Sequence, residues 1–267
     1  MHIVILDAHT TNPGDLSWED LKALGNVEVY ERTKEEELEA RIKNADILIT
    51  NKAPLKSEHF EMAPKLKGIS VLASGYDVVD IEAAAKRRIS VSNVPGYSTE
   101  SVSQHVFALL LSYSNKICEH NLAIKAGKWS AYPDFSMQLG SIHELRGKTI
   151  GILGFGTIGK EVALIAQAFG MKVLFYSRNQ QAIIINDTHQ VDFDTLLGES
   201  DIISLHMPLN KDSRELFNAE NLKKVKKGCI LINTAIGPIV NEAYLIYILK
   251  SGHLQAYLAD VSEQEPP

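Results

Sequence analysis

The sequence has few cysteines, no long apolar run and no excess of positive charge. Its two cysteines, Cys118 and Cys229, lie far apart in apolar surroundings, which favours buried thiols over a disulfide or a metal pair. The apolar runs stay below the roughly 18 residues that a membrane-spanning helix needs. Residues 1–10 resemble a strand rather than a signal peptide. We therefore expect a cytoplasmic protein with no membrane partner and no metal site.

The net charge of −6 argues against nucleic acid or an anionic membrane as a partner. The composition is otherwise that of an ordinary globular protein, with 45% hydrophobic and 22% charged residues. A length of 267 residues suits one or two α/β domains. The composition thus excludes several kinds of partner without identifying one.

Strand and helix patterns alternate through residues 1–98. Short apolar runs predict strands, and the stretches between them, such as residues 33–45, predict helices with charged outer faces. This alternation indicates βαβ units and a parallel sheet. The predicted strands cover residues 2–8, 27–32, 46–50, 68–74 and 90–95.

A long helix, apolar on more than one face, is expected over residues 99–126, and an irregular connection over residues 130–147. A second α/β pattern then begins at residue 148. We therefore expect two domains, residues 1–98 and residues 99–267, with the long helix linking them.

A glycine loop opens the second pattern. Gly154, Gly156 and Gly159, with Thr157 and Ile158 between them, fit G-x-G-x-x-G directly after an apolar strand and before a helix. The first glycine allows a tight turn, the second lets a pyrophosphate approach, and the third lets the helix pack on the strand. The free N–H groups of the helix N-terminus favour the anion. The alternative is a glycine turn with a purely structural role.

The end of the next strand bears on the choice of cofactor. An acid there would bind the ribose hydroxyls of NAD, but the sequence has Tyr176, Ser177 and Arg178. Ser177 removes repulsion against a 2′-phosphate, and Arg178 can pair with it. We therefore expect NADP in preference to NAD. The alternative is that Arg178 is only a solvated surface charge.

Taken in order along the chain, these motifs resemble the D-isomer-specific 2-hydroxyacid dehydrogenases. The resemblance covers nearly the whole chain and is closest to glycerate dehydrogenases, also called hydroxypyruvate reductases. It is carried by "TNKAPL" (50–55), "VLASGYDVVD" (71–80), "NVPGYSTESVSQHVFALLL" (93–111), "GFGTIG" (154–159), "SLHMPL" (204–209), "LINTAIG" (231–237) and "ADVSEQEPP" (259–267).

The resemblance implies an α/β fold, with a Rossmann dinucleotide-binding domain and a flavodoxin-like α/β substrate domain. It implies hydride transfer between NAD(P)H and a small 2-keto or 2-hydroxy acid, such as hydroxypyruvate and D-glycerate or glyoxylate. It also places an acid, Asp260, near the nicotinamide amide, although a helix N-cap would explain this residue too. Further implied cofactor contacts are Met207, Pro208, Thr234 and Ala235.

Family members use an arginine, a histidine and a glutamate in catalysis. The glutamate position matches Glu265, although Glu263 is a second loop acid. The arginine position is Ile236, which cannot form the charged, forked hydrogen bonds that a carboxylate accepts. The family histidine falls beyond Pro267, so the resemblance implies a C-terminally truncated chain that is less stable than an intact homologue. The remaining histidines, including His105, His206 and His253, are expected to be structural.

On the substrate side, the resemblance points to backbone N–H groups in the turn at Ser74 and Gly75. Lys52 can add a positive charge, or it can be an ordinary surface lysine. A homodimer contact along the helix at residues 99–126 is implied as well. With Ile236 at the arginine position, we expect an impaired enzyme. The alternatives are a catalytically dead dinucleotide-binding module, like the co-repressor relatives of the family, and a truncated remnant.

Overall fold

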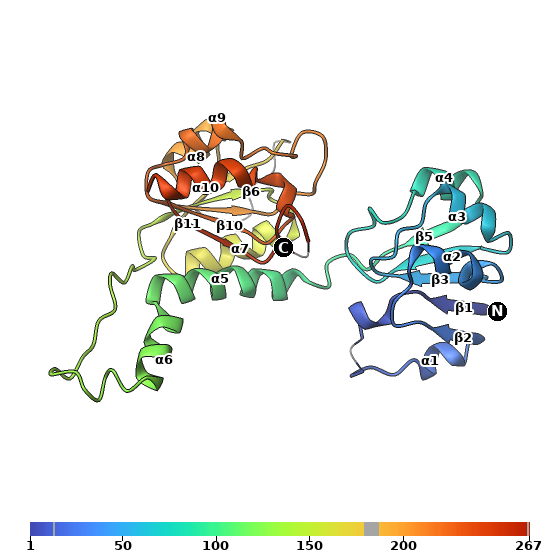
Figure 1. The fold of residues 1–267 in the computed structure, drawn as a ribbon. Helices are drawn as coiled ribbons and strands as arrows, with labels where there is room; N and C mark the ends of the chain where they lie inside the picture. The colour runs from blue at the N-terminus through green and yellow to red at the C-terminus, as the bar shows by residue number, and fades with distance from the viewer. Residues whose placement is uncertain (13, 179–186, 266) are drawn as a thin grey trace. The chain divides into compact units, whose positions relative to one another are not determined.

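The computed structural model describes residues 1–12, 14–178, 187–265 and 267. The chain divides into two compact units, Met1–Ser98 and Thr99–Pro267 (Figure 1). Each unit contains a parallel β-sheet with helices packed against it, so the predicted α/β class is confirmed. Among the described residues, each helix is too short or too polar to cross a membrane.

The first unit is built on a parallel sheet with strand order β2-β1-β3-β4-β5. This is the order of flavodoxin-like folds, as expected. Its strands are β1 (His2–Ile5), β2 (Asn26–Val29), β3 (Ile47–Thr50), β4 (Gly68–Val71) and β5 (Ser90–Ser92), and its α-helices are α1 (Glu19–Lys22), α2 (Glu35–Ile42), α3 (Ser57–Met62) and α4 (Ile81–Lys86).

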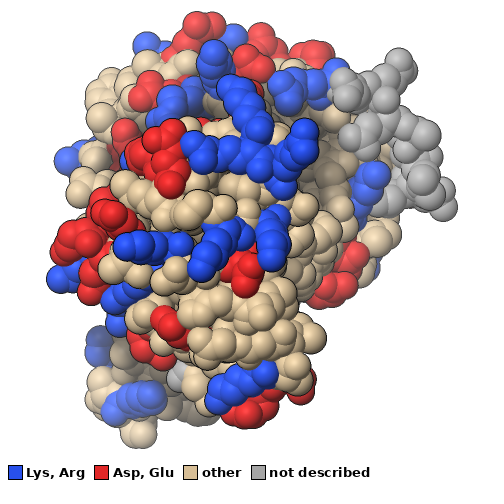
Figure 2. All heavy atoms as spheres, turned by 90° about the vertical axis from the view of Figure 1, so that its right-hand side faces the viewer, with Lys and Arg blue, Asp and Glu red and all other residues tan. Residues whose placement is uncertain are grey.

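The central strands of the first unit are apolar on both faces because helices cover both. On β1, Val4 packs into the cluster that α2, α3 and α4 complete, while Ile3 and Ile5 pack into a smaller cluster with Trp18. Continuous apolar runs of this kind are typical of buried parallel strands. Lys and Arg side chains lie among Asp and Glu side chains on the face drawn in Figure 2, so that face has charges of both signs.

The second unit contains a parallel sheet with strand order β11-β10-β9-β6-β7-β8. β6 pairs with both β7 and β9, so the order reverses beside β6, as in Rossmann folds. The strands are β6 (Thr149–Leu153), β7 (Lys172–Tyr176), β8 (Thr188–Gln190), β9 (Ile202–Leu205), β10 (Cys229–Asn233) and β11 (Leu254–Ala259).

Helices cover both faces of this second sheet (Figure 1). Two helices pack on one core cluster at one face of the sheet, and three helices pack on a second cluster at the other face. The helices are α5 (Thr99–Asn115) and α7 (Thr157–Ala168) on one face, and α8 (Phe193–Glu199), α9 (Ala219–Lys224) and α10 (Glu242–Lys250) on the other.

The single helix expected over residues 99–126 was a wrong prediction. The chain forms α5 and then α6 (Ile117–Lys125), and between them Lys116 has a left-handed backbone with φ of 53°. Its ammonium lies 5.3 Å from the ring centre of Tyr113 and 3.6 Å from the Glu119 carboxylate, and these contacts accompany the break. α5 buries Val106 in the core, whereas α6 extends away from the sheet of its unit (Figure 1).

Candidate dinucleotide-binding site

A pocket of about 330 Å³ lies at the carboxyl ends of β6, β7 and β9. This is the place where the strand order of the second sheet reverses, and ligands of open α/β sheets bind at such points. The pocket is lined by Gly154, Phe155, Gly156, Tyr176, Ser177, Arg178, His206, Met207, Pro208, Asn210, Asp212, Ser213 and Leu216. Six of the residues singled out in the sequence for cofactor binding are therefore brought together: Gly154, Gly156, Ser177, Arg178, Met207 and Pro208.

Gly154 forms the tight turn after β6. Its φ of 92° lies in the left-handed region, and a Cβ at this position would overlap the carbonyl oxygen of His206. Its N–H donates a hydrogen bond to the carbonyl oxygen of Tyr176 at 3.2 Å. Any side chain at position 154 would therefore push the carboxyl ends of β6 and β9 apart.

Gly156 and Gly159 differ in what surrounds them. Gly156 is the N-cap of α7, and a Cβ there would meet no atom of the described residues within 4 Å. A Cβ on Gly159 would overlap the carbonyl oxygen of Gly154, so this glycine lets the helix lie close to the loop. Thr157 and Ile158 are the first two residues of α7. Open space at the start of a 12-residue helix fits an approaching phosphate group.

The end of β7 is held by a neighbouring strand. Gln190 of β8 donates a side-chain hydrogen bond to the carbonyl oxygen of Ser177 at 3.1 Å. The next side chain, Arg178, pairs with Asp212, whose Oδ2 lies 3.0 Å from Arg178 Nη1. Asp212 was not predicted from the sequence. Its only signal was its place in the loop that follows the "SLHMPL" segment.

The loop that carries Asp212 is ordered by its own side chains. Asn210 Oδ1 accepts hydrogen bonds from the N–H groups of Asp212 and Ser213, at 2.9 and 3.1 Å. The Ser213 hydroxyl donates to the carbonyl oxygen of Pro208 at 2.8 Å. Asn is a frequent turn former because its side chain bonds the backbone two residues on. These contacts fix the backbone from which Asp212 reaches Arg178.

His206 has a structural place in the pocket wall, as expected. Its N–H donates to the carbonyl oxygen of Leu153 at 2.7 Å, and its Nε2 shares a 2.8 Å hydrogen bond with the Ser204 hydroxyl. Burial lowers the pKa of the imidazole to about 4. The ring is therefore neutral near pH 7 and adds no charge to the pocket.

The turn after β10 is organised by the fully buried Asn233, whose role was not predicted from the sequence. Its Nδ2 donates to the carbonyl oxygen of Ile236 and to the Tyr257 hydroxyl, each at 3.1 Å, and its Oδ1 accepts from Ala235 N–H at 3.0 Å. The hydroxyl of Thr234 is buried and has no hydrogen-bond partner among the described residues. An orphaned hydroxyl beside the strand end suits a group that arrives with a ligand.

Ile236 has an extended backbone, with φ of −150° and ψ of 133°, and its half-buried side chain packs against the core cluster on the α10 side of the sheet. The next residue, Gly237, touches the segment that follows β11, since a Cβ there would overlap the Ser262 carbonyl oxygen. The structure therefore brings the turn at Ile236 against the loop that contains Glu265.

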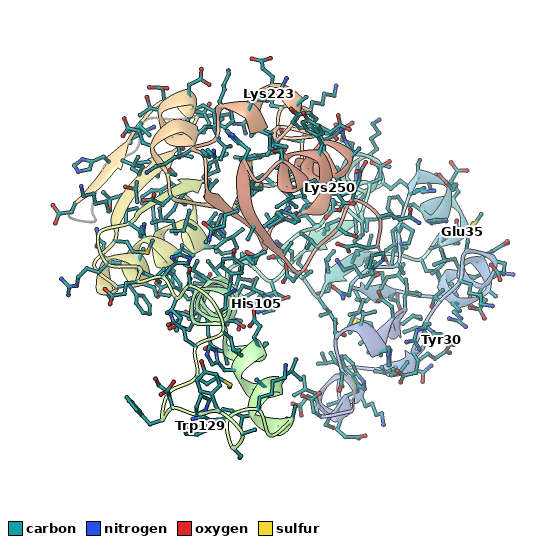
Figure 3. All side chains as sticks on the ribbon, turned by 60° about the vertical axis from the view of Figure 1, so that its left-hand side comes forward. Tyr30, Glu35, His105, Trp129, Lys223 and Lys250 are labelled. Atoms are coloured by element: carbon teal, nitrogen blue, oxygen red, sulfur yellow. The ribbon has the colours of Figure 1, made fainter. Side chains whose placement is uncertain are left out.

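Glu265 and Asp260 lie on that loop and at the end of β11. The Glu265 carboxylate accepts a hydrogen bond from Ser262 N–H at 3.2 Å, whereas Glu263 donates its N–H to the Glu242 carboxylate at 2.6 Å. Asp260 Oδ2 lies 3.5 Å from Nε2 of His105 on α5. His105 is labelled in Figure 3. Both side chains of this pair are about half exposed.

The three residues predicted to bind substrate lie in the first unit. Lys52 follows β3 and the pair Ser74 and Gly75 follows β4, and these neighbouring strands are parallel, so all three lie at the carboxyl edge of the sheet. Buried Asp7 accepts hydrogen bonds from the N–H groups of Asn51, Lys52 and Ala53 at 2.9, 2.5 and 3.0 Å. The Lys52 side chain is exposed. Asp7 was missed, although an acid at the end of β1 was visible in the sequence.

The strand order of the second unit and the glycine loop where this order reverses define a dinucleotide-binding α/β domain. The chain belongs to the D-isomer specific 2-hydroxyacid dehydrogenase family, because residues 107–267 match that family's NAD binding domain. Members of this family are NAD(P)-dependent oxidoreductases that act on the CH–OH group of 2-hydroxy acids. The predicted family, fold and reaction class are confirmed.

Individual proteins show the same likeness. The chain is 43% identical over 270 residues to a hydroxypyruvate reductase of Blautia hydrogenotrophica, covering 100% of this chain and 84% of that protein. An acyclic imino acid reductase in complex with NADPH and D-Arg superposes with a TM-score of 0.86 at 33% identity, covering 99% and 84%. A D-lactate dehydrogenase from Aquifex aeolicus, complexed with NAD and lactic acid, gives 0.86 at 29% identity, covering 99% and 78%.

Proposed function

We propose that the chain binds NADP(H) in preference to NAD(H) and is a weakened reductase of small 2-keto acids such as hydroxypyruvate or glyoxylate. The observation that carries this proposal is the pocket at the end of β7, where Ser177 and Arg178 stand in place of an acid. A cationic tip favours a 2′-phosphate, whereas an acid there would favour free ribose hydroxyls.

The described residues fit such a cofactor. The open space beside Gly156 and the N-terminus of α7 would hold the pyrophosphate. Thr234 and Ala235 in the turn after β10, with Asp260 after β11, would line the nicotinamide end, and the unpartnered Thr234 hydroxyl supports this. When bound, the cofactor donates or accepts the hydride. The protein holds both reactants and supplies charge and protons.

Weak catalysis follows from Ile236. A substrate carboxylate at this turn would find an aliphatic side chain where family members have an arginine, and losing a hydrogen bond to a charged group costs about 1.5–3 kcal/mol. Within the first unit, we propose the exposed Lys52 ammonium and the N–H groups of the Ser74–Gly75 turn as anchors for a carboxylate. Glu265, which already bonds its own loop, is the proposed partner of a proton-transfer group.

A second candidate function is a dinucleotide-binding module without turnover. It is favoured because the glycine loop is intact, whereas Ile236 leaves the turn after β10 without a positive charge for a substrate. The two candidates share the cofactor site and differ only in whether the bound cofactor is oxidised.

We also propose a homodimer formed through α5 and α6. The support is a group of exposed apolar side chains on α6 and the segment after it: Ile117, Leu122, Ile124, Trp129 and Phe135. Trp129 is marked in Figure 3. The proposed compartment is the cytoplasm, because free thiols suit a reducing environment. Cys229 is buried, as predicted, but Cys118 is exposed, so the prediction of a buried thiol was wrong for Cys118.

The test combines binding with turnover. Titration with NADPH and NADH should give tighter binding of NADPH, and hydroxypyruvate or glyoxylate should then cause slow NADPH oxidation. Equal or tighter binding of NADH would overturn the cofactor preference. Fast turnover would overturn the claim of weak catalysis, and binding with no turnover at any substrate concentration would favour the module.

A further inference from the structure

Arg178 does not stand alone at the cofactor pocket. Its Nη1 lies 3.0 Å from Asp212 Oδ2, and the two side chains are 66% and 76% exposed. They come from different connections, one after β7 and one after β9, and both line the same pocket. An acid therefore lies at the cationic tip of β7, although β7 itself has none.

Both sides of this pair are held in place. On the first side, Gln190 of β8 bonds the carbonyl oxygen of Ser177, next to Arg178. On the second, Asn210 and Ser213 order the loop so that Asp212 projects from a fixed backbone. The segment after β7 and the loop after β9 therefore need no backbone rearrangement for Arg178 and Asp212 to pair.

The pair has opposite consequences for the two cofactors. A 2′-phosphate that reaches Arg178 must displace the Asp212 carboxylate or share the guanidinium with it, and in either case lies close to it, at like charge. The 2′-hydroxyl of NADH carries no charge, so it gains little from Arg178 and is not repelled by Asp212. An exposed ion pair of this kind contributes little to folding stability. Its effect should therefore appear in binding rather than in the melting temperature.

We propose that Asp212 is a specificity-determining residue that occupies Arg178 and so limits the preference for NADPH over NADH. This inference rests on the proposed function, because it assumes that Arg178 is the contact for the 2′-phosphate. With Arg178 occupied in this way, a chain with a basic tip on β7 should still accept NADH.

The experiment measures dissociation constants for NADPH and NADH by calorimetry on the full chain. Asp212→Asn should tighten NADPH binding by about three- to tenfold and change NADH binding by less than about twofold. The matched control is Asp194→Asn, which removes an exposed acid of the same unit that pairs with Lys224 at 3.2 Å and does not line the pocket. The control should leave both constants unchanged.

A second variant separates the two claims. Arg178→Gln should weaken NADPH binding, and in that background Asp212→Asn should no longer tighten it, since the carboxylate then has no cation to occupy. If Arg178→Gln weakens NADPH binding while Asp212→Asn does not tighten it in the native background, the role of Asp212 is overturned and the proposed cofactor preference stands. If Arg178→Gln leaves NADPH binding unchanged, the preference itself is overturned.

Discussion

The buried side-chain amide of Asn233 donates a hydrogen bond to the backbone carbonyl oxygen of Ile236 at 3.1 Å. The turn is thus fixed through the backbone of Ile236, and its extended φ of −150° suits any residue. The side chain at position 236 can therefore be exchanged without changing the path of the chain, so its charge can be tested separately from the fold.

Replacing Ile236 with arginine should strengthen substrate use. The guanidinium can form charge-assisted hydrogen bonds with a 2-keto acid carboxylate, which are worth about 1.5–3 kcal/mol. We expect kcat/KM for hydroxypyruvate to rise at least about tenfold. The loss of a half-buried aliphatic side chain should cost about 1 kcal/mol of stability. Steady-state kinetics with NADPH at saturation measures the gain.

The control for this substitution is Ile236→Gln, which is similar in length but neutral. It should reproduce the small loss of stability without the gain in kcat/KM. An arginine variant no better than the glutamine variant would show that position 236 does not face the substrate.

Two alanine substitutions in the glycine loop should have contrasting effects. Gly154→Ala places a Cβ against the His206 carbonyl at a φ of 92°, and we expect a loss of at least about 2 kcal/mol in stability. Gly156→Ala meets open space, so the melting temperature should stay within about 2 °C. Its NADPH affinity should nevertheless fall, because the added methyl group occupies the approach to α7. Unchanged affinity in a folded Gly156→Ala variant would contradict the assigned pyrophosphate site.

Asn233→Ala should destabilise the second unit. It removes three hydrogen bonds inside the protein and leaves the Tyr257 hydroxyl without a donor, and we expect a loss of about 2–4 kcal/mol. Tyr257→Phe removes only one of those contacts and should cost about 1 kcal/mol. Thermal unfolding followed by circular dichroism compares the two. Equal melting temperatures for both variants would argue against Asn233 as the organiser of the turn.

Stability should fall as the pH drops from about 6.5 towards 4. Burial lowers the pKa of His206 from 6.5 to about 4, so over this interval the unfolded chain binds a proton that the folded chain does not. The folded state loses up to about 3 kcal/mol across the interval. The pKa of Asp46 is lowered to about 2, mainly by its hydrogen bond with Lys67, so its stabilising contribution is present above about pH 4 and is lost only below that pH.

His206→Gln tests the assignment of this pH effect. The variant has no group that titrates at this position, so its melting temperature should change less between pH 6.5 and 4.5 than that of the native chain. A slope identical to that of the native chain would mean that another group takes up the proton.

Much of the fold could be predicted because its signals are local. Apolar runs such as residues 46–50 and 229–235 indicated buried parallel strands, and the glycine pattern with a strand before it indicated the dinucleotide loop. The break at Lys116 could not be predicted, since a left-handed lysine inside a helical pattern depends on contacts with Tyr113 and Glu119. Propensity alone favoured a continuous helix.

The candidate site was predictable in part, for a similar reason. Gly154, Gly156 and Arg178 follow a recognisable motif along the chain. Asp212 does not, because its role comes from a partner that is 34 residues away in sequence, and the contact of Asn233 with Tyr257 likewise spans 24 residues. Pairings of that kind are set by the sheet topology and not by sequence spacing.

Ile236 and Gly237 are adjacent in sequence but opposite in what they tolerate. A side chain at position 237 would collide with the Ser262 carbonyl, whereas the side chain at position 236 is only half buried and the turn is fixed there through the backbone. A library randomised at both positions and selected for folding should therefore vary at 236 and return glycine at 237. The side chain at position 236 can therefore be substituted while the backbone of the turn keeps its conformation.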